Sequence, residues 1–430
     1  MKILWLSAGL LPDACRALGR GVQVTGGWVD SQLQALLSND GGENQYFMLS
    51  FDYRKCDIQL GRVHHRSFGE IRGITYGKSV PSFVEKQAHD AIKEFSPDVI
   101  HIHGSEYFYG RMNPSVYCGA PTIVSIQGIL TPYTAVMTGN LVPHQMFWHQ
   151  FNLKRFRYNS TVFNDQKYWE RMRVPQEKLV FKSHKNFMGR TDWDRAWAFA
   201  LQPEARYFHV NETLRAPFYT QTIRDEKKVV KHTIYCSAAA GYSLKGAHIL
   251  FEAVSFLKRK YPDVQVRVCA AQKLNGRRSL STILHDDQYG SYLRKLIRDL
   301  DIEQNVVGLP SLSAEEVAAE LERAEVFVLP SFCENSPNSL GEAQLIGTPA
   351  IATYVGGTPS ILRDGIDGRL VQAGDSAILA GAIDDYFLHP DLARTYACEA
   401  RALAVMRHSP AFNAQDTMRA YEAIAGNKIT

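Results

Sequence analysis

The chain has 430 residues, with 48 Lys and Arg against 44 Asp and Glu, which gives a formal net charge of +4. This balance is too mild to identify a nucleic-acid-binding protein. Apolar residues make up 45% and charged residues 21%, a composition that excludes a disordered or collagen-like chain and is typical of a globular protein. At about 150 residues per domain, the length predicts two or three domains.

The seven cysteines are scattered along the chain and include no Cys-x-x-Cys pair. A disulfide framework or a structural zinc site is therefore not expected, and a reducing compartment fits better. The first residues are interpreted as a buried strand and not as a signal peptide, because Lys2 is the only basic residue there and no small-residue cleavage site follows. No apolar run reaches the roughly 18 residues that span a bilayer.

The first half of the chain alternates short apolar runs with stretches of helical spacing. Strands are expected at residues 2–7, 45–50, 97–103, 121–126 and 205–210, and helices at 28–37 and 82–95. A long insert that is rich in aromatic and basic residues follows the fourth strand, from about 146 to 185.

The second half restarts the same alternation. Strands are expected at 233–237, 264–270, 305–309, 326–329 and 350–353, and helices at 247–260, 288–300, 313–324 and 339–346. The third of these helices begins with Ser313 and Glu316 in a capping-box pattern. Two blocks of alternating strands and helices predict an α/β protein with two doubly wound parallel sheets, whose ligands lie at the carboxyl ends of the strands.

The most specific segment is a buried strand followed by a polar loop and the start of a helix. Glu334 lies in the loop and Glu342 in the first part of the helix. The N–H groups of Asn338, Ser339 and Leu340 would lie at the helix N-terminus, whose unpaired donors and partial positive charge suit a diphosphate. Carboxylates accept hydrogen bonds from hydroxyls, which suits ribose and hexose. Ser339 and Glu342 also fit a capping box, so a structural role for Glu342 stays open.

This segment resembles the E-x7-E motif of the retaining GT-B glycosyltransferases of family four, the glycosyl transferases group one. The match is close over residues 300–375 and includes Gly356, Gly357 and the segment 364–371. The resemblance implies that the first glutamate contacts the donor sugar, the second contacts the nucleotide ribose, and the backbone between them binds the diphosphate. It also implies two Rossmann-like domains that face each other across a cleft, retention at the anomeric carbon, and no metal or other cofactor.

The domain boundary is expected near residues 216–228, where Pro217 is followed by a charged run. We therefore expect an N-terminal, acceptor-side domain at 1–217 and a C-terminal domain at 218–408 that binds the nucleotide sugar. By the resemblance, residues 409–430 form a helix that crosses back to the first domain.

Lys245, with the glycine after it, resembles the phosphate-binding Lys-Gly of the family. A lysine is a suitable point charge for a departing diphosphate, although a lysine at a helix start is also commonly a solvated charge. The family commonly has an arginine five or six positions earlier, where this chain has Ala239 and Ala240. Arg277 or Arg278 is a candidate replacement for that cation.

Candidate residues of the N-terminal half follow its expected strands. Gly27, which we expect to bind the donor, is part of a glycine pair that lets backbone approach a phosphate or sugar, although a plain turn also explains it. His103 and Glu106 come at the end of one strand, and Gln127 follows the next strand, where many relatives have a histidine. Arg190 is expected on the acceptor side, with a structural Arg–Asp pair as the alternative.

Residues 152–185 combine many Lys and Arg residues with aromatic residues. Such a segment suits an anionic membrane surface or single-stranded nucleic acid, and the alternative is a solvated helix pair with its aromatic rings packed inward. Given the family, we expect peripheral contact with an anionic membrane and no nucleic-acid partner. The expected location is the cytoplasm, with peripheral attachment to the inner face of the membrane.

The predicted function is the retaining transfer of a sugar from a nucleotide-diphosphate sugar to a hydroxyl of a saccharide acceptor. A lipid-linked acceptor in surface polysaccharide or glycoconjugate biosynthesis fits the family. Lys245, Glu334 and His103 are the expected catalytic residues. The alternatives are a sugar-nucleotide epimerase or phosphorylase of the same fold, or a non-catalytic protein that binds nucleotide sugars.

Overall fold

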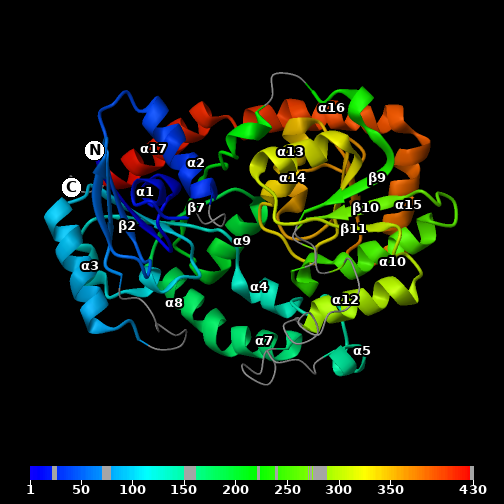
Figure 1. Ribbon diagram of the computed structural model, residues 1–430. Helices are drawn as coiled ribbons and strands as arrows, with labels where there is room; N and C mark the ends of the chain where they lie inside the picture. Colours follow the sequence, from blue (N-terminus) through cyan, green and yellow to red (C-terminus); the bar gives the residue numbers. More distant parts are fainter. Residues whose placement is uncertain are drawn as a thin grey trace. The chain divides into compact units, whose positions relative to one another are not determined.

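The computed structural model describes residues 1–21, 27–69, 79–149, 161–219, 223–237, 241–269, 271, 274 and 288–426. They form two compact units (Figure 1). The first unit comprises Met1–Leu130, Glu170–Arg215 and Arg407–Thr430, and the second comprises Thr131–Trp169 and Ala216–Met406. Each unit is built on one sheet of mostly parallel strands, so the predicted α/β class with two parallel-sheet domains is confirmed.

The sheet of the first unit has the order β3-β4-β2-β1-β5-β6-β7-β8 in the described part of the chain. Its strands are β1 (Lys2–Ser7), β2 (Gln45–Ser50), β3 (Cys56–Leu60), β4 (Val63–Ser67), β5 (Val99–His103), β6 (Thr122–Ser125), β7 (Asn186–Gly189) and β8 (Arg206–His209). Neighbouring strands are parallel except for the β3–β4 pair. The chain builds outward from β1 first to β2 and later to β5, so the switch point of this sheet lies between β1 and β5.

Successive side chains of a strand point to opposite faces, and β1 therefore contributes to two cores. Trp5 packs with α2 (Gly27–Asn39) and α17 (Pro410–Ala425) on one face, whereas Leu4 packs with α3 (Ser82–Phe95) and α8 (Val174–Ser183) on the other. The C-terminal helix α17, red in Figure 1, lies beside α2. Its Tyr421 hydroxyl accepts a hydrogen bond from Trp5 Nε1 at 3.0 Å, which ties the end of the chain to its first strand.

The described part of the first unit also contains several shorter helices. They are α1 (Pro12–Ala17), η1 (Phe108–Arg111), η2 (Pro114–Tyr117) and α9 (Asp192–Leu201), and α4 (Leu130–Ala135) begins at the boundary of the unit.

The sheet of the second unit has the order β11-β10-β9-β12-β13-β14, and all its neighbouring strands are parallel. The strands are β9 (Val230–Cys236), β10 (Gln265–Val268), β11 (Val306–Gly308), β12 (Ala324–Leu329), β13 (Ala350–Thr353) and β14 (Arg369–Val371). The helices among its described residues are α10 (Ala247–Leu257), α12 (Gln288–Asp299), α13 (Ala314–Arg323), α14 (Asn338–Ile346), α15 (Ser376–Leu388) and α16 (Pro390–Arg407). Short turns of helix are η5 (Ala216–Phe218), η6 (Glu226–Lys228), η7 (Ser243–Lys245) and η9 (Thr358–Ser360).

Residues 131–169 belong to the second unit although they precede most of it in sequence. They contain α5 (Pro143–Met146), η3 (Phe147–His149) and α7 (Val162–Tyr168), and the π-helix η4 (Trp169–Arg173) follows. Leu141 and Met146 are buried in the core of the second unit, which explains why this segment leaves the first. The sequence predicted domains at 1–217, 218–408 and 409–430. These ranges placed residues 131–169 in the N-terminal domain, whereas the structure places them in the second unit.

All seven cysteines are free thiols. Within the described ranges, no helix has both the length and the apolar character that crossing a membrane requires.

Candidate functional site

The switch point of the second sheet lies between β9 and β12. The chain adds β10 and β11 on one side of β9 and then returns to place β12 on the other side. Crevices at such points, outside the carboxyl ends of the strands, are the usual ligand sites of open α/β sheets. Lys245 follows β9 and Glu334 follows β12, so both lie at this end of neighbouring strands.

Lys245 and Glu334 form an ion pair at this switch point. Lys245 Nζ lies 2.6 Å from Glu334 Oε1, and the Ser331 hydroxyl donates to the same oxygen at 2.7 Å. Glu334 is only 6% exposed, whereas the Lys245 side chain keeps 32% of its surface. The structure thus brings together two residues that are 89 positions apart and that the sequence assigned to one donor site.

Two glycines allow the backbone to hold this pair. Gly246 has a φ of +73°, and a Cβ there would lie 2.0 Å from the Pro330 carbonyl oxygen. Gly356 has a φ of +50°, and a Cβ there would lie 1.9 Å from the Glu334 carbonyl oxygen. A side chain at position 246 would push the loop that carries Lys245 away from Pro330, and a side chain at position 356 would push against the backbone of Glu334 itself.

The N-terminus of α14 begins four residues after Glu334. Its N-cap is Pro337, and the cap makes no side-chain hydrogen bond, so the capping box expected as an alternative for Ser339 is wrong. The Leu340 N–H donates to the Pro337 carbonyl at 3.0 Å, whereas the Asn338 and Ser339 N–H groups have no acceptor among the described residues. Two of the three expected diphosphate donors are therefore open. Glu342, the fifth residue of the helix, is 5% exposed.

The family resemblance places a second cation five or six positions before Lys245. The residues at 239 and 240 and the candidate replacements Arg277 and Arg278 all lie outside the described residues.

The first unit carries a second group of expected residues at its own switch point. His103 ends β5 and is 1% exposed, with its ring centroid 4.3 Å from Trp5 and 3.9 Å from His101. Among the described residues, neither ring nitrogen of His103 has a hydrogen-bond partner. Burial holds the pKa of His103 well below its usual value, so the imidazole is neutral and has an acceptor nitrogen to offer.

His101, two residues earlier on the same strand, is a structural histidine. Its Nδ1 lies 2.6 Å from the Tyr421 hydroxyl, and its Nε2 lies 2.6 Å from Ser125 Oγ. Both nitrogens are therefore engaged inside the unit and are not available to a ligand.

Glu106 follows β5 and lies close to Arg173 and Arg190. Burial raises the pKa of Glu106 to about 7, although the two guanidinium groups oppose the shift. Within the described structure, its buried Oε2 has no hydrogen-bond partner. Gly104, with a φ of +101°, leaves the space that this oxygen needs, because a Cβ there would lie 2.9 Å from it. The carboxyl group is thus about half protonated near neutral pH.

Arg190, which lies near Glu106, also packs against the ring of Trp28. Its guanidinium lies 5.4 Å from that ring and forms a buried ion pair with Glu212 Oε1 at 2.7 Å. Asp194 accepts a hydrogen bond from the Arg190 backbone N–H at 3.0 Å. The carboxylate that the structure pairs with the Arg190 side chain is therefore Glu212, and the alternative of an Arg–Asp pair had the wrong partner.

Gly27 and Gln127 occupy less constrained positions. Gly27 is the first residue of α2, and the nearest atom to a Cβ there would be Arg215 Cδ at 3.8 Å, which is ordinary contact. The fold itself therefore does not demand glycine at this position. Gln127 lies just after β6, half-buried, and it has an interaction partner.

Sequence reasoning missed Glu177, a buried carboxylate that links two loops. It accepts hydrogen bonds from Ser105 Oγ at 3.0 Å and from the Leu130 N–H at 2.9 Å. Ser105 directly precedes Glu106, so Glu177 fixes the loop that carries Glu106. Glu212, the partner of Arg190, was missed as well, and only the three-dimensional structure reveals either contact.

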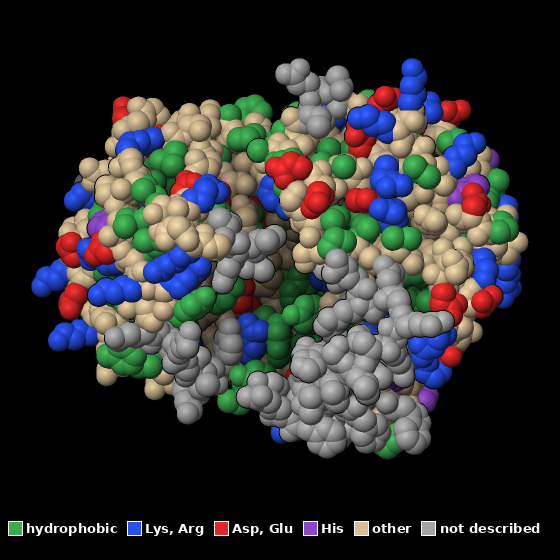
Figure 2. Space-filling view, viewed as in Figure 1, with side chains coloured by type: hydrophobic (Ala, Val, Ile, Leu, Met, Phe, Trp, Pro, Cys, Tyr) green, Lys and Arg blue, Asp and Glu red, His purple; other side chains and the backbone are tan. Residues whose placement is uncertain are grey.

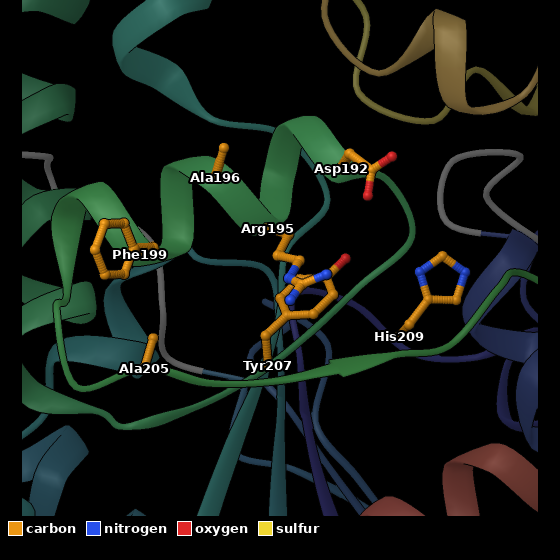
Figure 3. A pocket seen from close by; sticks show the side chains of 7 residues that line it. All are labelled: Asp192, Arg195, Ala196, Phe199, Ala205, Tyr207 and His209. Carbon is orange, nitrogen blue, oxygen red and sulfur yellow. The ribbon is translucent and has the colours of Figure 1, made fainter.

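A cavity of about 700 Å³ in the second unit has Lys245 in its wall. A second cavity, of about 760 Å³, lies in the first unit between α9 and β8 (Figure 3). Figure 3 shows Arg195 and Phe199 on α9 above Tyr207 and His209 on β8. No residue of the two groups described above lines this second cavity.

The basic and aromatic stretch 152–185 is divided between the units, and its residues 152–160 lie outside the described part. The described remainder consists of α7, the π-helix and α8. Phe163 packs against the core of the second unit and Phe181 is buried in the first, whereas Tyr168 is exposed. Figure 2 shows basic and acidic side chains interspersed over the visible face.

Comparison with known proteins gives a family match for the second half of the chain. Residues 219–402 match the family model described as glycosyl transferases group 1. A D-inositol 3-phosphate glycosyltransferase of Pseudarthrobacter chlorophenolicus is 33% identical over 162 residues, which are 37% of this chain and 36% of the relative. The corresponding protein of Streptomyces coelicolor is 35% identical over 149 residues, 35% of this chain and 31% of that one. The matched stretch thus spans about a third of the length of these curated relatives.

Solved structures resemble the whole chain. A sucrose-phosphate synthase from Thermosynechococcus elongatus aligns with a TM-score of 0.70 at 14% identity, over 99% of this chain and 100% of that one. Anabaena HepE in complex with UDP and glucose aligns with a TM-score of 0.61 at 15% identity, over 97% of this chain and 98% of the other. At such low identity, these likenesses establish the fold alone.

Proposed function

We propose, because residues 219–402 belong to the glycosyl transferases group 1 family and the chain has the GT-B fold, that this protein is a glycosyltransferase. It transfers a sugar from a nucleotide-diphosphate sugar to a hydroxyl of a saccharide acceptor. The observation that carries the proposal is the Lys245–Glu334 pair at the switch point of the second sheet, beside a helix N-terminus with open N–H groups.

The second unit supplies the charges that a departing diphosphate requires. Lys245 Nζ provides one positive charge, and the open N–H groups of Asn338 and Ser339 provide hydrogen bonds together with the positive end of the α14 dipole. Preorganised donors of this kind stabilise charge as it develops on the leaving group. Because these groups belong to the chain itself, the proposed reaction requires no metal ion or other cofactor.

The two carboxylates divide the recognition of the donor. Glu334 lies beside Lys245, next to the phosphate, and accepts hydrogen bonds from hydroxyls of the donor sugar. Glu342 lies further along α14 and accepts those of the ribose. The Ser331 hydroxyl, which binds Glu334 Oε1, leaves Oε2 of this carboxylate for the sugar.

The first unit supplies polar contacts to the saccharide part of the acceptor in this proposal. Neutral His103 accepts a hydrogen bond from a hydroxyl, and Glu106, Gln127 and Arg190 supply further polar contacts near the end of β5 and β6. Gly27 is assigned to the donor and not to the acceptor, because it lets a phosphate or sugar approach the backbone at the start of α2. In the reaction, the bond from the anomeric carbon to the phosphate oxygen breaks, and the acceptor oxygen bonds to that carbon on the same face. The acceptor proton passes to an oxygen of the departing diphosphate, so no protein base is needed and configuration is retained.

The acceptor is proposed to be lipid-linked and the enzyme to act at the inner face of an anionic membrane, in surface polysaccharide or glycoconjugate biosynthesis. The basic and aromatic stretch 152–185 supports this proposal, because a Lys or Arg near an anionic surface contributes about 1 kcal/mol of binding.

A screen of UDP-, GDP-, ADP- and TDP-sugars by thermal shift tests the donor first, since a ligand of the native state raises the apparent stability. The UDP complex of the HepE structure makes UDP-sugars the first candidates. Donors that stabilise the protein are then assayed for transfer to saccharides. If no nucleotide sugar stabilises the protein or is turned over, the proposal fails.

A further inference from the structure

The cavity of about 700 Å³ in the second unit is built by segments that are far apart in sequence. One wall comes from residues 133–169, with Met137, Val162 and Trp169 among its side chains, and the other from residues 241–245 and the start of α12. Its volume falls within the range of small-molecule pockets. This cavity could not be predicted from the sequence, because its walls meet only once residues 131–169 pack on the second unit.

The walls are fixed to each other. Ser243 Oγ donates to the Met137 carbonyl at 2.8 Å, and His248 Nε2 lies 2.9 Å from the Gly139 carbonyl. Gly139 has a φ of +59°, and a Cβ there would lie 2.4 Å from the Ser243 carbonyl oxygen. The cavity is therefore a formed part of the unit and not a gap between loosely packed segments.

Several polar side chains around the cavity are hydrogen-bonded inside the protein. Gln288 accepts from the Val162 N–H at 3.0 Å and donates to the Met146 carbonyl at 3.0 Å, so both ends of its amide are used. The Tyr133 hydroxyl accepts from the Asn335 N–H at 3.1 Å.

The same holds for other polar side chains of the walls. The Tyr289 hydroxyl lies 2.9 Å from His248 Nδ1, and Thr161 Oγ1 accepts from the Asn164 N–H at 3.1 Å. Asp165 and Lys245 add one charge of each sign to the walls. The rest of the wall is mainly aromatic ring and aliphatic surface, and such surface gains free energy by covering hydrocarbon.

The position of Lys245 indicates what kind of molecule binds in this cavity. Because its side chain lines the cavity, any occupant lies beside the proposed site of the leaving diphosphate. A nucleoside diphosphate sugar brings phosphates, hydroxyls and a base that all require hydrogen-bond partners, whereas most of the side chains that line the cavity are aromatic or aliphatic. An apolar occupant at this place must then be part of the other substrate.

We infer that this cavity binds the hydrocarbon part of an amphiphilic acceptor, a saccharide linked to an alkyl or lipid chain. The inference rests on the proposed glycosyl transfer and specifies its acceptor. Met137, Val162, Leu244 and Trp169 cover the chain, while its saccharide head extends toward Lys245.

Alkyl glucosides of increasing chain length, from methyl to octyl and below their micelle concentrations, are the probes for this site. Their dissociation constants are measured by titration calorimetry, with and without a nucleotide sugar. We expect each added methylene to tighten binding by about fourfold, until the cavity is filled. Binding that does not depend on chain length overturns the inference.

Two variants locate the effect. Val162→Asp places a charge in the apolar wall, and Met137→Gln makes the opposite side polar at nearly constant volume; both should flatten the chain-length dependence. Tyr168→Asp adds the same charge to an exposed position of α7 outside the cavity and should keep that dependence. If the dependence of binding on chain length is undiminished in both wall variants, the inference is wrong. Should one variant be unstable, the other is sufficient for this test.

Nucleotide binding separates this inference from the proposed function. Val162→Asp should bind the nucleoside diphosphate as the parent protein does. If it loses the nucleotide instead, the cavity belongs to the donor and the inference is wrong while glycosyl transfer stands. If alkyl chains bind in the cavity but no donor is ever turned over, the proposed function fails while the cavity assignment holds.

Discussion

The buried carboxyl group of Glu106 allows a quantitative prediction about stability. Replacing it by Gln removes the ionisable group and keeps the shape of the side chain. In the folded protein burial raises the pKa of Glu106 from 4.5 to about 7. Below pH 4.5 the carboxyl group is protonated in both states, and it adds no pH dependence. Between pH 4.5 and 7 it is ionised only in the unfolded chain, so the parent protein loses stability as pH rises through this window.

The size of the effect follows from the pKa difference at 1.36 kcal/mol per unit, which gives about 3 kcal/mol over the whole window. Glu106→Gln has no such titration. The variant should therefore gain roughly 2–3 kcal/mol relative to the parent protein between pH 5 and pH 8. Any constant cost of accommodating the amide cancels in this comparison.

Urea denaturation at pH 5 and pH 8 measures the two free energies of unfolding. Tryptophan fluorescence is a suitable signal because Trp5 and Trp28 lie in the same unit as Glu106. Glu43→Gln, at an exposed position of the same unit, controls for the loss of one surface carboxylate. If the difference between Glu106→Gln and the parent protein is the same at both pH values, Glu106 is not held protonated, and our account of the acceptor side is refuted.

Three further predictions concern the donor and the membrane. Lys245→Ala should lower turnover by about 10²–10³ and weaken binding of the nucleoside diphosphate, and unchanged steady-state turnover would mean that another cation serves the diphosphate. Glu334→Gln should impair transfer with nearly intact nucleoside diphosphate binding, whereas Glu342→Gln should weaken that binding; equal effects in calorimetry would contradict the division of roles. The stretch 152–185 should bind the protein to anionic vesicles, so the protein should sediment with them, and high salt should weaken this binding. Equal, negligible sedimentation with neutral and anionic vesicles would exclude membrane binding.

Local signals in the sequence predicted the buried strands well. β1, β2 and β13 have the predicted bounds, because continuous apolar runs with polar flanks are distinctive in parallel sheets. The capping box of Ser313 and Glu316 is confirmed, with the Glu316 N–H 3.2 Å from Ser313 Oγ. Ser339 and Glu342 have the same spacing but form no such cap, since the N-cap of α14 is Pro337 and Ser339 is already the second residue of the helix. The spacing of a cap does not by itself determine where the helix starts.

Polar strands and short strands could not be predicted from the sequence, for a physical reason. β4 contains two histidines and an arginine, and it is held by pairing with β2 and β3 and not by its own apolar pattern. β14 has only three residues and one buried side chain. Such strands depend on neighbours that the local sequence does not reveal.

The sequence located Lys245 and Glu334, since each follows a recognisable strand, but not their direct contact. Contacts between residues that are far apart in the sequence could not be predicted. An example is the hydrogen bond between the Tyr421 hydroxyl and His101, which are 320 positions apart. The largest omission was residues 131–169, whose apolar side chains complete the second unit. Their burial depends on the tertiary structure, and helical spacing alone gave no indication of which unit they join.

Our central claim is that this protein moves a sugar from a nucleotide diphosphate to an acceptor hydroxyl. The most direct test incubates the protein with each stabilising nucleotide sugar and octyl glucoside, and measures the released nucleoside diphosphate and the glycosylated product by mass spectrometry. We predict one molecule of glycosylated product for each nucleoside diphosphate released, and neither product with Lys245→Ala on the same time scale. Release of the nucleotide without any glycosylated acceptor, across the whole set of donors, would contradict the claim and favour an epimerase of the same fold.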